Sequence, residues 1–182
     1  MIQIDPTFYT TAPIEKSGRL EKEMRVYELL DELEVSFIRI DHDVTASIEE
    51  CHEVEKLLEI TICKNLFLCT ANKSQFYLLM MPGEKKFKTS DASKKIGSSR
   101  LSFASPEYMQ EYLDITPGSV SVLGLMNDHN NKVQLVIDRE LLDEEYIGCH
   151  PCINTSSLKI ATKDLMEKIL PRIGHNAMVI EL

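Results

Sequence analysis

The 182-residue sequence lacks any apolar run long enough to cross a membrane. Its longest apolar-leaning stretches, Ile62 to Thr70 and Phe76 to Met81, fall far short of the roughly 20 residues that a membrane helix needs. The first ten residues contain Asp5 and lack the basic start of a secretory signal. We therefore expect a cytoplasmic protein.

Glycine and proline are scarce, with 7 residues of each, and the sequence has no glycine-rich strand-to-helix turn of the dinucleotide or P-loop kind. With 43% apolar and 27% charged residues, the composition excludes collagen, coiled coil and general disorder. Five cysteines, an odd number, favour reduced thiols over a disulfide framework. The length fits one globular domain.

Basic residues are outnumbered by acidic ones, 20 to 29, so the formal charge is −9. Such a balance disfavours wholesale wrapping of nucleic acid, because each neutralised phosphate needs a lysine or arginine. The segment 85–100 is the exception, since it has one carboxylate among six cations: Lys85, Lys86, Lys88, Lys94, Lys95 and Arg100. Charge runs of this kind are either a solvated helix face or a local phosphate-binding patch.

Hydrophobic periodicity predicts an irregular alternation of helices and strands. Helices are expected over 18–33, 47–59, 90–96, from 105 onward and over 162–170, and strands over 35–40, 62–70, 75–81, 120–125, 133–137, 158–161 and 177–182. Ser47 and Glu50 form a capping box at the start of the second helix. The strand pairs 62–70 with 75–81 and 120–125 with 133–137 are expected to form two hairpins. The predicted class is mixed α/β, with a central mixed, mostly antiparallel sheet and helices packed outside it.

Two polar residues stand out from their surroundings. Lys64 interrupts the apolar run 62–69, either as a strand-end lysine whose ammonium reaches water or as a cation at a cleft mouth that meets an anion or a developing oxyanion. His150 precedes Pro151, which restricts it to extended geometry, and Asn154 follows with an amide. The local pattern leaves open whether this loop is a structural turn or a site.

The spacing of Cys149 and Cys152 suits metal ligation or thiol exchange. A redox pair needs its first cysteine at a helix N-terminus, whereas a strand is expected after this loop. A structural zinc site needs four ligands, and the chain has no second pair of cysteines at this spacing. We expect these thiols to act as small buried apolar groups, and we expect no metal and no cofactor.

Four stretches, taken in order, resemble the freestanding prolyl-tRNA editing proteins of the YbaK/ProX superfamily, which deacylate mischarged tRNA. The stretches are 64–68, 100–104, 117–120 and 148–155. The resemblance extends from about Leu20 to the C-terminus. It implies a single aminoacyl-tRNA editing domain over 1–182, with an extension over 1–17 and a core over about 20–182.

The resemblance further implies that the chain hydrolyses the ester of alanyl-tRNA(Pro). The acceptor end of tRNA(Pro) would be its partner, and prolyl-tRNA synthetase is a second candidate. In the family, activity depends most on the lysine that matches Lys64, and the loop that matches His150 and Pro151 lines the aminoacyl pocket. The family's turn is usually Gly-x-x-x-Pro, whereas here Val122 follows Gly118 where proline is common.

These parallels define the expected site. The catalytic group comprises Lys64, His150, Gly118 and Ser119, with backbone N–H groups supplied by the 118–121 turn. Asn154 and Pro151 are expected to bind substrate, and Val122 and Ile153 to form the walls that exclude larger side chains. The cations of the 85–100 segment would hold the acceptor stem.

Three other functions fit parts of the same pattern. The first is deacylation of cysteinyl-tRNA(Pro), because cysteine and alanine are both small. The second is a non-catalytic module that binds the acceptor stem and has no need of Lys64. The third is a metal or redox protein built on Cys149 and Cys152.

Overall fold

The computed structural model describes residues 3–44 and 48–182. The described strands form one eight-stranded sheet, in which seven strands follow the order β1-β7-β6-β2-β3-β5-β8 and β4 pairs with β2 off this path. The strands are β1 (Phe37–Asp41), β2 (Thr61–Thr70), β3 (Phe76–Pro82), β4 (Leu101–Phe103), β5 (Val133–Asp138), β6 (Tyr146–Cys149), β7 (Ser156–Ala161) and β8 (Ala177–Ile180).

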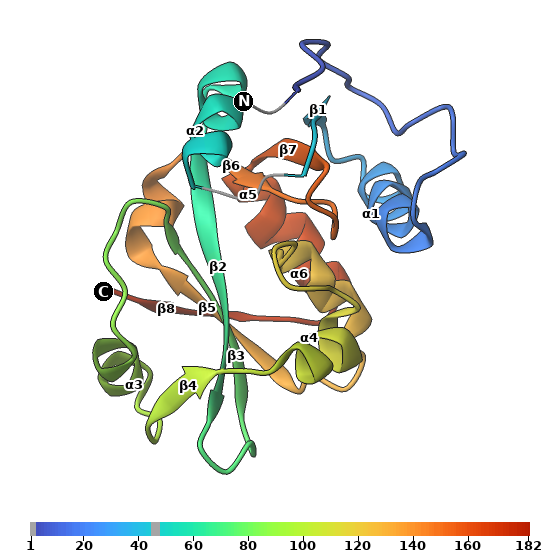
Figure 1. Cartoon of the computed structure of the whole chain (residues 1–182). Helices are drawn as coiled ribbons and strands as arrows, with labels where there is room; N and C mark the ends of the chain where they lie inside the picture. The colour runs from blue at the N-terminus through green and yellow to red at the C-terminus, as the bar shows by residue number, and fades with distance from the viewer. Residues whose placement is uncertain (1–2, 45–47) are drawn as a thin grey trace.

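Helices cover both faces of this sheet (Figure 1). They are α1 (Glu21–Glu32), α2 (Ile48–Leu58), α3 (Thr89–Ile96), α4 (Pro106–Leu113), the short 3-10 helices η1 (Val122–Asn127) and η2 (Arg139–Asp143), and a C-terminal helix that runs through α5 (Thr162–Asp164), a π turn η3 (Leu165–Ile169) and α6 (Leu170–Arg172). The strand pairings within the described residues are mixed, four antiparallel and three parallel. The expected fold class is confirmed.

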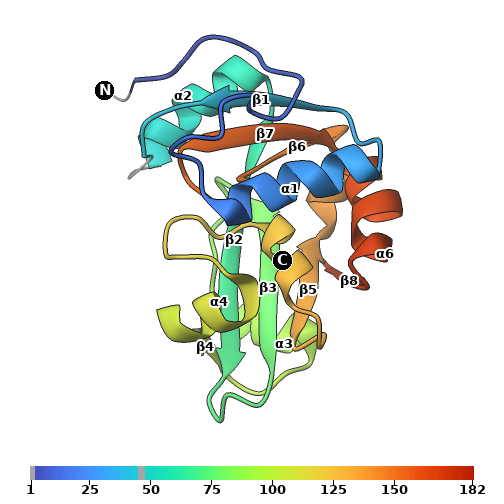
Figure 2. The ribbon, with the colours of Figure 1, turned by 90° about the vertical axis from the view of Figure 1, so that its right-hand side faces the viewer.

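The long strand β2 links the two ends of the molecule (Figure 2). It pairs antiparallel with β3 along most of its length, parallel with β6 at residues 61–62, and antiparallel with β4 at residues 68–70. Among the described strands, residues 63–66 of β2 therefore have β3 on one side and no partner strand on the other. This open stretch contains Lys64.

Two apolar cores lie on opposite faces of β2 and β3, as the two-residue alternation of a strand requires. Phe67 and Leu78 belong to the larger core, beneath α1 and α4, and Leu68 and Leu79 belong to the smaller core, beneath α3. In α1, Met24, Tyr27 and Leu30 are buried as the periodicity predicts. Leu20 is exposed because the helix begins only at Glu21.

The expected second hairpin is wrong. Residues 122–127 form the 3-10 helix η1, where the Ser121 side chain accepts a hydrogen bond from the Leu123 backbone N–H at 3.2 Å. A Cβ at Gly124 would overlap Ile115, so this helix packs too closely for a larger residue. β5 pairs in parallel with β3 and β8 instead. When every residue of an apolar run is buried, the run shows neither the 3.6-residue period of a helix nor the two-residue period of a strand. Its sequence then does not distinguish the two structures.

The other predicted elements are present to within a few residues, whereas β4, β6 and η2 were not expected from the sequence. The hairpin of β2 and β3 is confirmed, and so are α3, the start of α4 at Pro106, and β8. Ser47 of the predicted capping box lies outside the described residues. In α2, Val54 and Leu58 are buried as expected, whereas Leu57 is exposed.

Candidate active site

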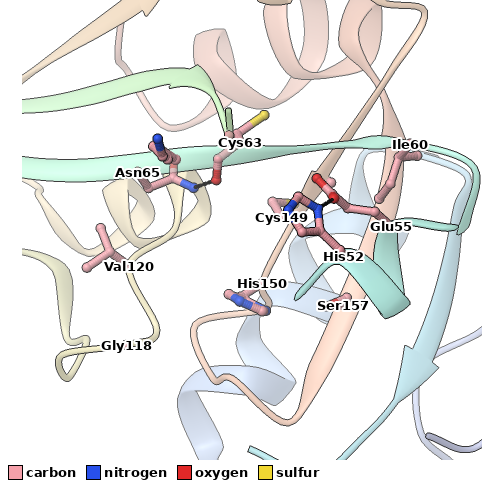
Figure 3. A pocket seen from close by; sticks show the side chains of 13 residues that line it. His52, Glu55, Ile60, Cys63, Asn65, Gly118, Val120, Cys149, His150 and Ser157 are labelled. Carbon is pink, nitrogen blue, oxygen red and sulfur yellow. Dashed lines mark hydrogen bonds and ion pairs between the residues drawn. The ribbon is translucent and has the colours of Figure 1, made fainter. Parts of the chain in front are cut away.

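A cavity of about 260 Å³ opens beside the unpaired stretch of β2. Four parts of the chain surround it: residues 52–65 in α2 and β2, Gly83, the 118–120 turn, and residues 148–157 in β6, its following loop and β7 (Figure 3). Its lining residues are His52, Glu55, Ile60, Cys63, Lys64, Asn65, Gly83, Gly118, Val120, Gly148, Cys149, His150 and Ser157. Lys64, Gly118 and His150, all predicted site residues, therefore meet at one cavity.

Lys64 is held at this cavity by the backbone. Its Nζ donates a hydrogen bond to the Lys85 carbonyl oxygen at 2.9 Å, and the side chain is half-buried. An ammonium carries three N–H donors, so two remain for a ligand. The arrangement fits the reading of Lys64 as a cation at a cleft mouth.

His150 presents an unprotonated nitrogen. Its Nδ1 lies 2.9 Å from the Ser156 carbonyl oxygen, which can only accept, so the neutral ring is assigned the Nδ1–H tautomer. Burial lowers the pKa of His150, and the neighbouring His42 lowers it further, while the bond to Ser156 opposes them. His150 therefore stays neutral at pH 7 and leaves Nε2 as a hydrogen-bond acceptor.

Asn65 is a cavity residue that the sequence reasoning missed. Its Nδ2 donates to the Cys63 carbonyl oxygen at 3.3 Å, while its Oδ1 is buried without a hydrogen-bond partner. Buried polar atoms are rarely left unpaired, so this oxygen singles out Asn65 among the residues that line the cavity. The available signal was the second polar residue in the same apolar run as Lys64.

Histidines at 42 and 52 were also missed. The buried His42 ring lies 6.3 Å from the His150 ring, and its Nε2 is 2.9 Å from the Ser157 hydroxyl, which faces the cavity. His52 lies on α2, where it pairs with Glu55. Neither histidine has a local sequence pattern that marks it, because only the fold brings them beside His150.

Gly118 lines the cavity, whereas the adjacent Ser119 does not. Gly118 adopts φ +88°, a left-handed conformation that favours glycine, and a Cβ there would lie 3.3 Å from Asn154 Nδ2. The Ser119 backbone N–H already donates to the Thr116 carbonyl at 3.1 Å, so this amide is not available to a substrate. The expectation that the turn offers a row of free N–H groups is therefore wrong at Ser119.

A second, more open cavity of about 520 Å³ lies on the other side of the 150–155 loop. Ser119, Ile153 and Asn154 line this second cavity and not the first. Its floor is charged. Arg19 pairs there with Glu23 at 2.7 Å and with Asp41, and the Ser156 hydroxyl donates to Asp41 at 2.6 Å.

The proposed wall residue Val122 faces neither cavity. It is fully buried in the larger core, because η1 turns its side chain inward. Val120, two residues earlier, lines the first cavity in its place. Pro151 is buried and is not among the residues that line either cavity.

The cations of the 85–100 segment have two different environments. Lys85 is paired with Asp138 at 2.8 Å and with Glu140 at 2.6 Å. Burial alone would lower the pKa of Lys85, but these two carboxylates outweigh it and raise the pKa. The other five are exposed and form no hydrogen bond or ion pair within the described chain: Lys86, Lys88, Lys94, Lys95 and Arg100.

The cysteines have the properties of buried apolar groups. Cys63, Cys149 and Cys152 are buried free thiols. Burial raises the pKa of Cys63 and of Cys152 to about 12 and that of Cys149 further, which suppresses the reactive thiolate. Across residues 3–44 and 48–182, no group of three or more histidine, cysteine or acidic side chains is placed to hold a metal ion.

Comparison with known proteins decides the family. The model of the aminoacyl-tRNA editing domain matches residues 42–168, which contain all four walls of the first cavity. The chain belongs to the aminoacyl-tRNA editing domain family. As a member it is an aminoacyl-tRNA deacylase, an ester hydrolase of translation fidelity.

Relatives and solved structures agree over most of the chain. The prolyl-tRNA editing protein ProX of Acetoanaerobium sticklandii is 35% identical over 90% of this chain and 99% of its own. The prolyl-tRNA synthetase associated domain-containing protein 1 of Danio rerio is 28% identical over 93% and 89%. A crystal structure of a candidate trans-editing enzyme for prolyl-tRNA synthetase has the same fold, with a TM-score of 0.63, 17% identity and coverage of 90% and 98%.

No helix among the described residues is both long and apolar enough to span a bilayer. This agrees with the absence of long apolar runs in the sequence.

Proposed function

We propose that this editing-domain protein acts in trans on mischarged tRNA(Pro) and releases alanine from alanyl-tRNA(Pro). The observation that carries the proposal is the convergence of Lys64, Asn65 and His150 on one small cavity. The 35% identity to a prolyl-tRNA editing protein supports the tRNA(Pro) part. The small cavity volume supports a small side chain.

The reaction needs little from the protein, because an aminoacyl ester is already activated. Water adds to the ester carbonyl carbon, the carbon–oxygen bond to the ribose breaks, and the ribose oxygen leaves with a proton. A site that positions the water and stabilises the developing oxyanion is sufficient.

Each cavity residue has a distinct role in this scheme. The Lys64 ammonium, fixed by the Lys85 carbonyl, faces the carbonyl oxygen or the 3′-terminal phosphate. The Nε2 of His150 accepts a hydrogen bond from the attacking water or from the substrate's ammonium. Rotation of the Asn65 side chain on binding would turn its Oδ1, buried and unpaired in the free protein, toward the same ammonium. A ribose hydroxyl of the substrate helps to orient the water.

In this proposal the RNA passes the second cavity on its way to the first. Asn154 lies at the border between the cavities, beside Gly118, where it meets the terminal nucleotide. The exposed cations of the 85–100 segment hold the acceptor stem. The protein works in the cytoplasm, where tRNA is charged, beside prolyl-tRNA synthetase.

One assay separates the candidate functions. Purified protein is incubated with alanyl-, cysteinyl- and prolyl-tRNA(Pro), and release of the amino acid is followed under single-turnover conditions. We expect alanyl-tRNA(Pro) to be cleaved fastest and prolyl-tRNA(Pro) to be spared. Faster release of cysteine would identify a cysteinyl-tRNA(Pro) deacylase, and binding without cleavage of any ester would identify an acceptor-stem binding module.

A further inference from the structure

Phe103 is the most exposed aromatic side chain in the described part of the chain, with 61% of its surface accessible. It ends β4, a three-residue strand in which Leu101 supplies the core contact. An exposed phenylalanine forgoes the favourable free energy that burial of its ring would give. The proposed cavity chemistry uses no residue of β4.

The orientation of Phe103 is fixed by a second aromatic ring. Phe87, which is partly buried against the smaller core, lies edge-to-face with Phe103 at a centroid distance of 6.0 Å. Edge-to-face packing is a favoured geometry for aromatic pairs. Phe103 is therefore supported from one side and remains open to solvent on the other.

Five unpaired cations lie beside these two rings in sequence or in the helix that contacts β4. Lys86 and Lys88 flank Phe87 in sequence, and Arg100 directly precedes β4. Lys94 and Lys95 lie in the last turn of α3, which β4 contacts through a hydrogen bond from the Leu101 N–H to Ser93 Oγ at 3.1 Å. An exposed ring among exposed cations in a protein of charge −9 matches the chemistry of an unpaired base on a phosphate backbone.

The rings also lie along the route to the cavity. Phe103 is opposite Leu68 in the β2–β4 register, four residues beyond Lys64 on β2. At about 3.3 Å per residue this is about 13 Å along the strand. Phe87 follows two residues after Lys85, whose carbonyl holds the Lys64 ammonium. A strand with its terminal ester at Lys64 would thus pass the rings several nucleotides upstream.

We propose that Phe103, supported by Phe87, is a stacking platform for an unpaired base in the 3′ single-stranded end of the RNA, upstream of the terminal adenosine. This surface deepens the proposed function and rests on it for the direction of the strand. The cations supply affinity through phosphates, whereas the ring supplies a contact that only an unstacked base makes.

Binding of an RNA hairpin that carries no amino acid and has a single-stranded 3′ end tests the platform without any need for catalysis. Fluorescence anisotropy measures Kd for the wild type and for Phe103→Ala, Phe103→Leu and Phe103→Trp across a salt series. We expect Kd to rise about 10-fold for Phe103→Ala, to rise nearly as much for Phe103→Leu, and to be kept by Phe103→Trp. The slope of log Kd against log salt should stay unchanged, because no phosphate contact is lost.

Two controls make this result specific. Phe8→Ala removes another exposed aromatic ring, 53% accessible and far away in sequence, and should leave Kd unchanged. An RNA with an abasic nucleotide at the stacked position should bind the wild type about 10-fold more weakly and lose nothing further with Phe103→Ala. Thermal unfolding of each variant checks that the fold is intact.

Several outcomes would overturn the platform. They are an unchanged Kd for Phe103→Ala, an equal loss on a blunt-ended hairpin, or loss of prolyl-tRNA synthetase binding while the RNA Kd stays constant, which would assign the surface to a protein partner. Failure of the proposed function looks different. A wild type that binds the hairpin through Phe103 but cleaves no ester would refute the deacylation proposal and leave the platform standing.

Discussion

The two cavities on either side of the 150–155 loop differ in kind. The first is small and mostly apolar, and its polar side chains are Lys64, Asn65, the neutral imidazole of His150, Ser157 and the pair of His52 with Glu55. The second is wider and has the Arg19, Glu23 and Asp41 ion pairs at its base. In the first cavity, polar groups are left for a ligand. In the second, they largely bind one another, which makes it a rigid support for the loop.

A chain of hydrogen bonds links this support to His150. Asp41 accepts from both Arg19 and Ser156, and the Ser156 carbonyl in turn accepts from His150 Nδ1. The ion pairs of the second cavity thus help to fix the tautomer of a residue that lines the first. If this comparison is right, substitutions in the first cavity should affect the rate most, and those in the second should act through position or binding.

The largest effect is expected for Lys64→Ala. Deacylation of alanyl-tRNA(Pro) should be abolished while the fold stays intact, because Lys64 makes one backbone hydrogen bond and no core contact. The single-turnover rate measures the loss, and the thermal midpoint checks the fold. Lys132→Ala is the matched control and should retain the rate, because this exposed lysine lines neither cavity and lies outside the 85–100 segment. Near wild-type turnover in Lys64→Ala would refute the assignment.

His150→Ala should reduce the single-turnover rate by roughly 10²-fold, which is typical of the loss of one positioned polar group. Asn154→Ala, across the loop, should cost less in rate and more in RNA binding. An equal loss of rate in both variants would erase the distinction between the cavities.

The pH dependence of stability gives a second readout for His150. Burial lowers the pKa of both His150 and His42 in the folded protein, so the unfolded chain binds more protons as pH falls through about 6.5. The free energy of unfolding should therefore decrease below pH 6.5. Urea melts at several pH values should show a weaker decrease in His150→Gln. An unchanged pH slope in this variant would mean that His150 titrates normally.

Two valines that lie two residues apart have different environments: Val120 lines the first cavity, and Val122 is buried in the larger core. Val120→Ala should widen the first cavity and raise cleavage of prolyl-tRNA(Pro) relative to alanyl-tRNA(Pro). Val122→Ala should instead lower stability by about 1–3 kcal/mol, because it hollows the core, and should leave the substrate ratio unchanged. Rates on both esters and the urea midpoint distinguish the two results. A changed ratio in Val122→Ala alone would restore the wall predicted from the sequence.

Much of this contrast could be read from the sequence, and the rest depended on the fold. Lys64 and His150 stood out because each breaks a local rule, a charge in an apolar run and a histidine locked by proline, but the local pattern left their roles open and only the family resemblance implied them. Val122 was misassigned because period-two apolar residues look alike in a buried 3-10 helix and in a strand. His42 and Ser157 contribute through long-range contact, and no local pattern encodes their meeting with His150.

The basic segment should show a smaller, salt-dependent effect. Replacing Lys94, Lys95 and Arg100 together by alanine should weaken RNA binding and flatten the slope of log Kd against log salt, since each phosphate contact contributes about 0.7–0.9 to it. Lys85→Ala should leave the slope nearly unchanged, because Asp138 and Glu140 already neutralise that ammonium. Anisotropy across a salt series measures both. Identical slopes for the triple variant and the wild type would show that the patch is a solvated face.

The smallest effect is expected at the thiols, although Cys149 lines the first cavity and Cys152 the second. The Cys149→Ser, Cys152→Ser double variant should keep the deacylation rate to within a few-fold, because burial holds both thiols protonated and unreactive. Its stability should fall, since each new hydroxyl is buried where a thiol needed no hydrogen bond. Assays with and without a chelator, together with metal analysis of the purified protein, complete the test. Stoichiometric zinc, or a rate abolished by the double substitution at a temperature where the variant stays folded, would move the chemistry from Lys64 to the cysteines. A rate that persists in the variant would support ester hydrolysis by the site of Lys64, Asn65 and His150.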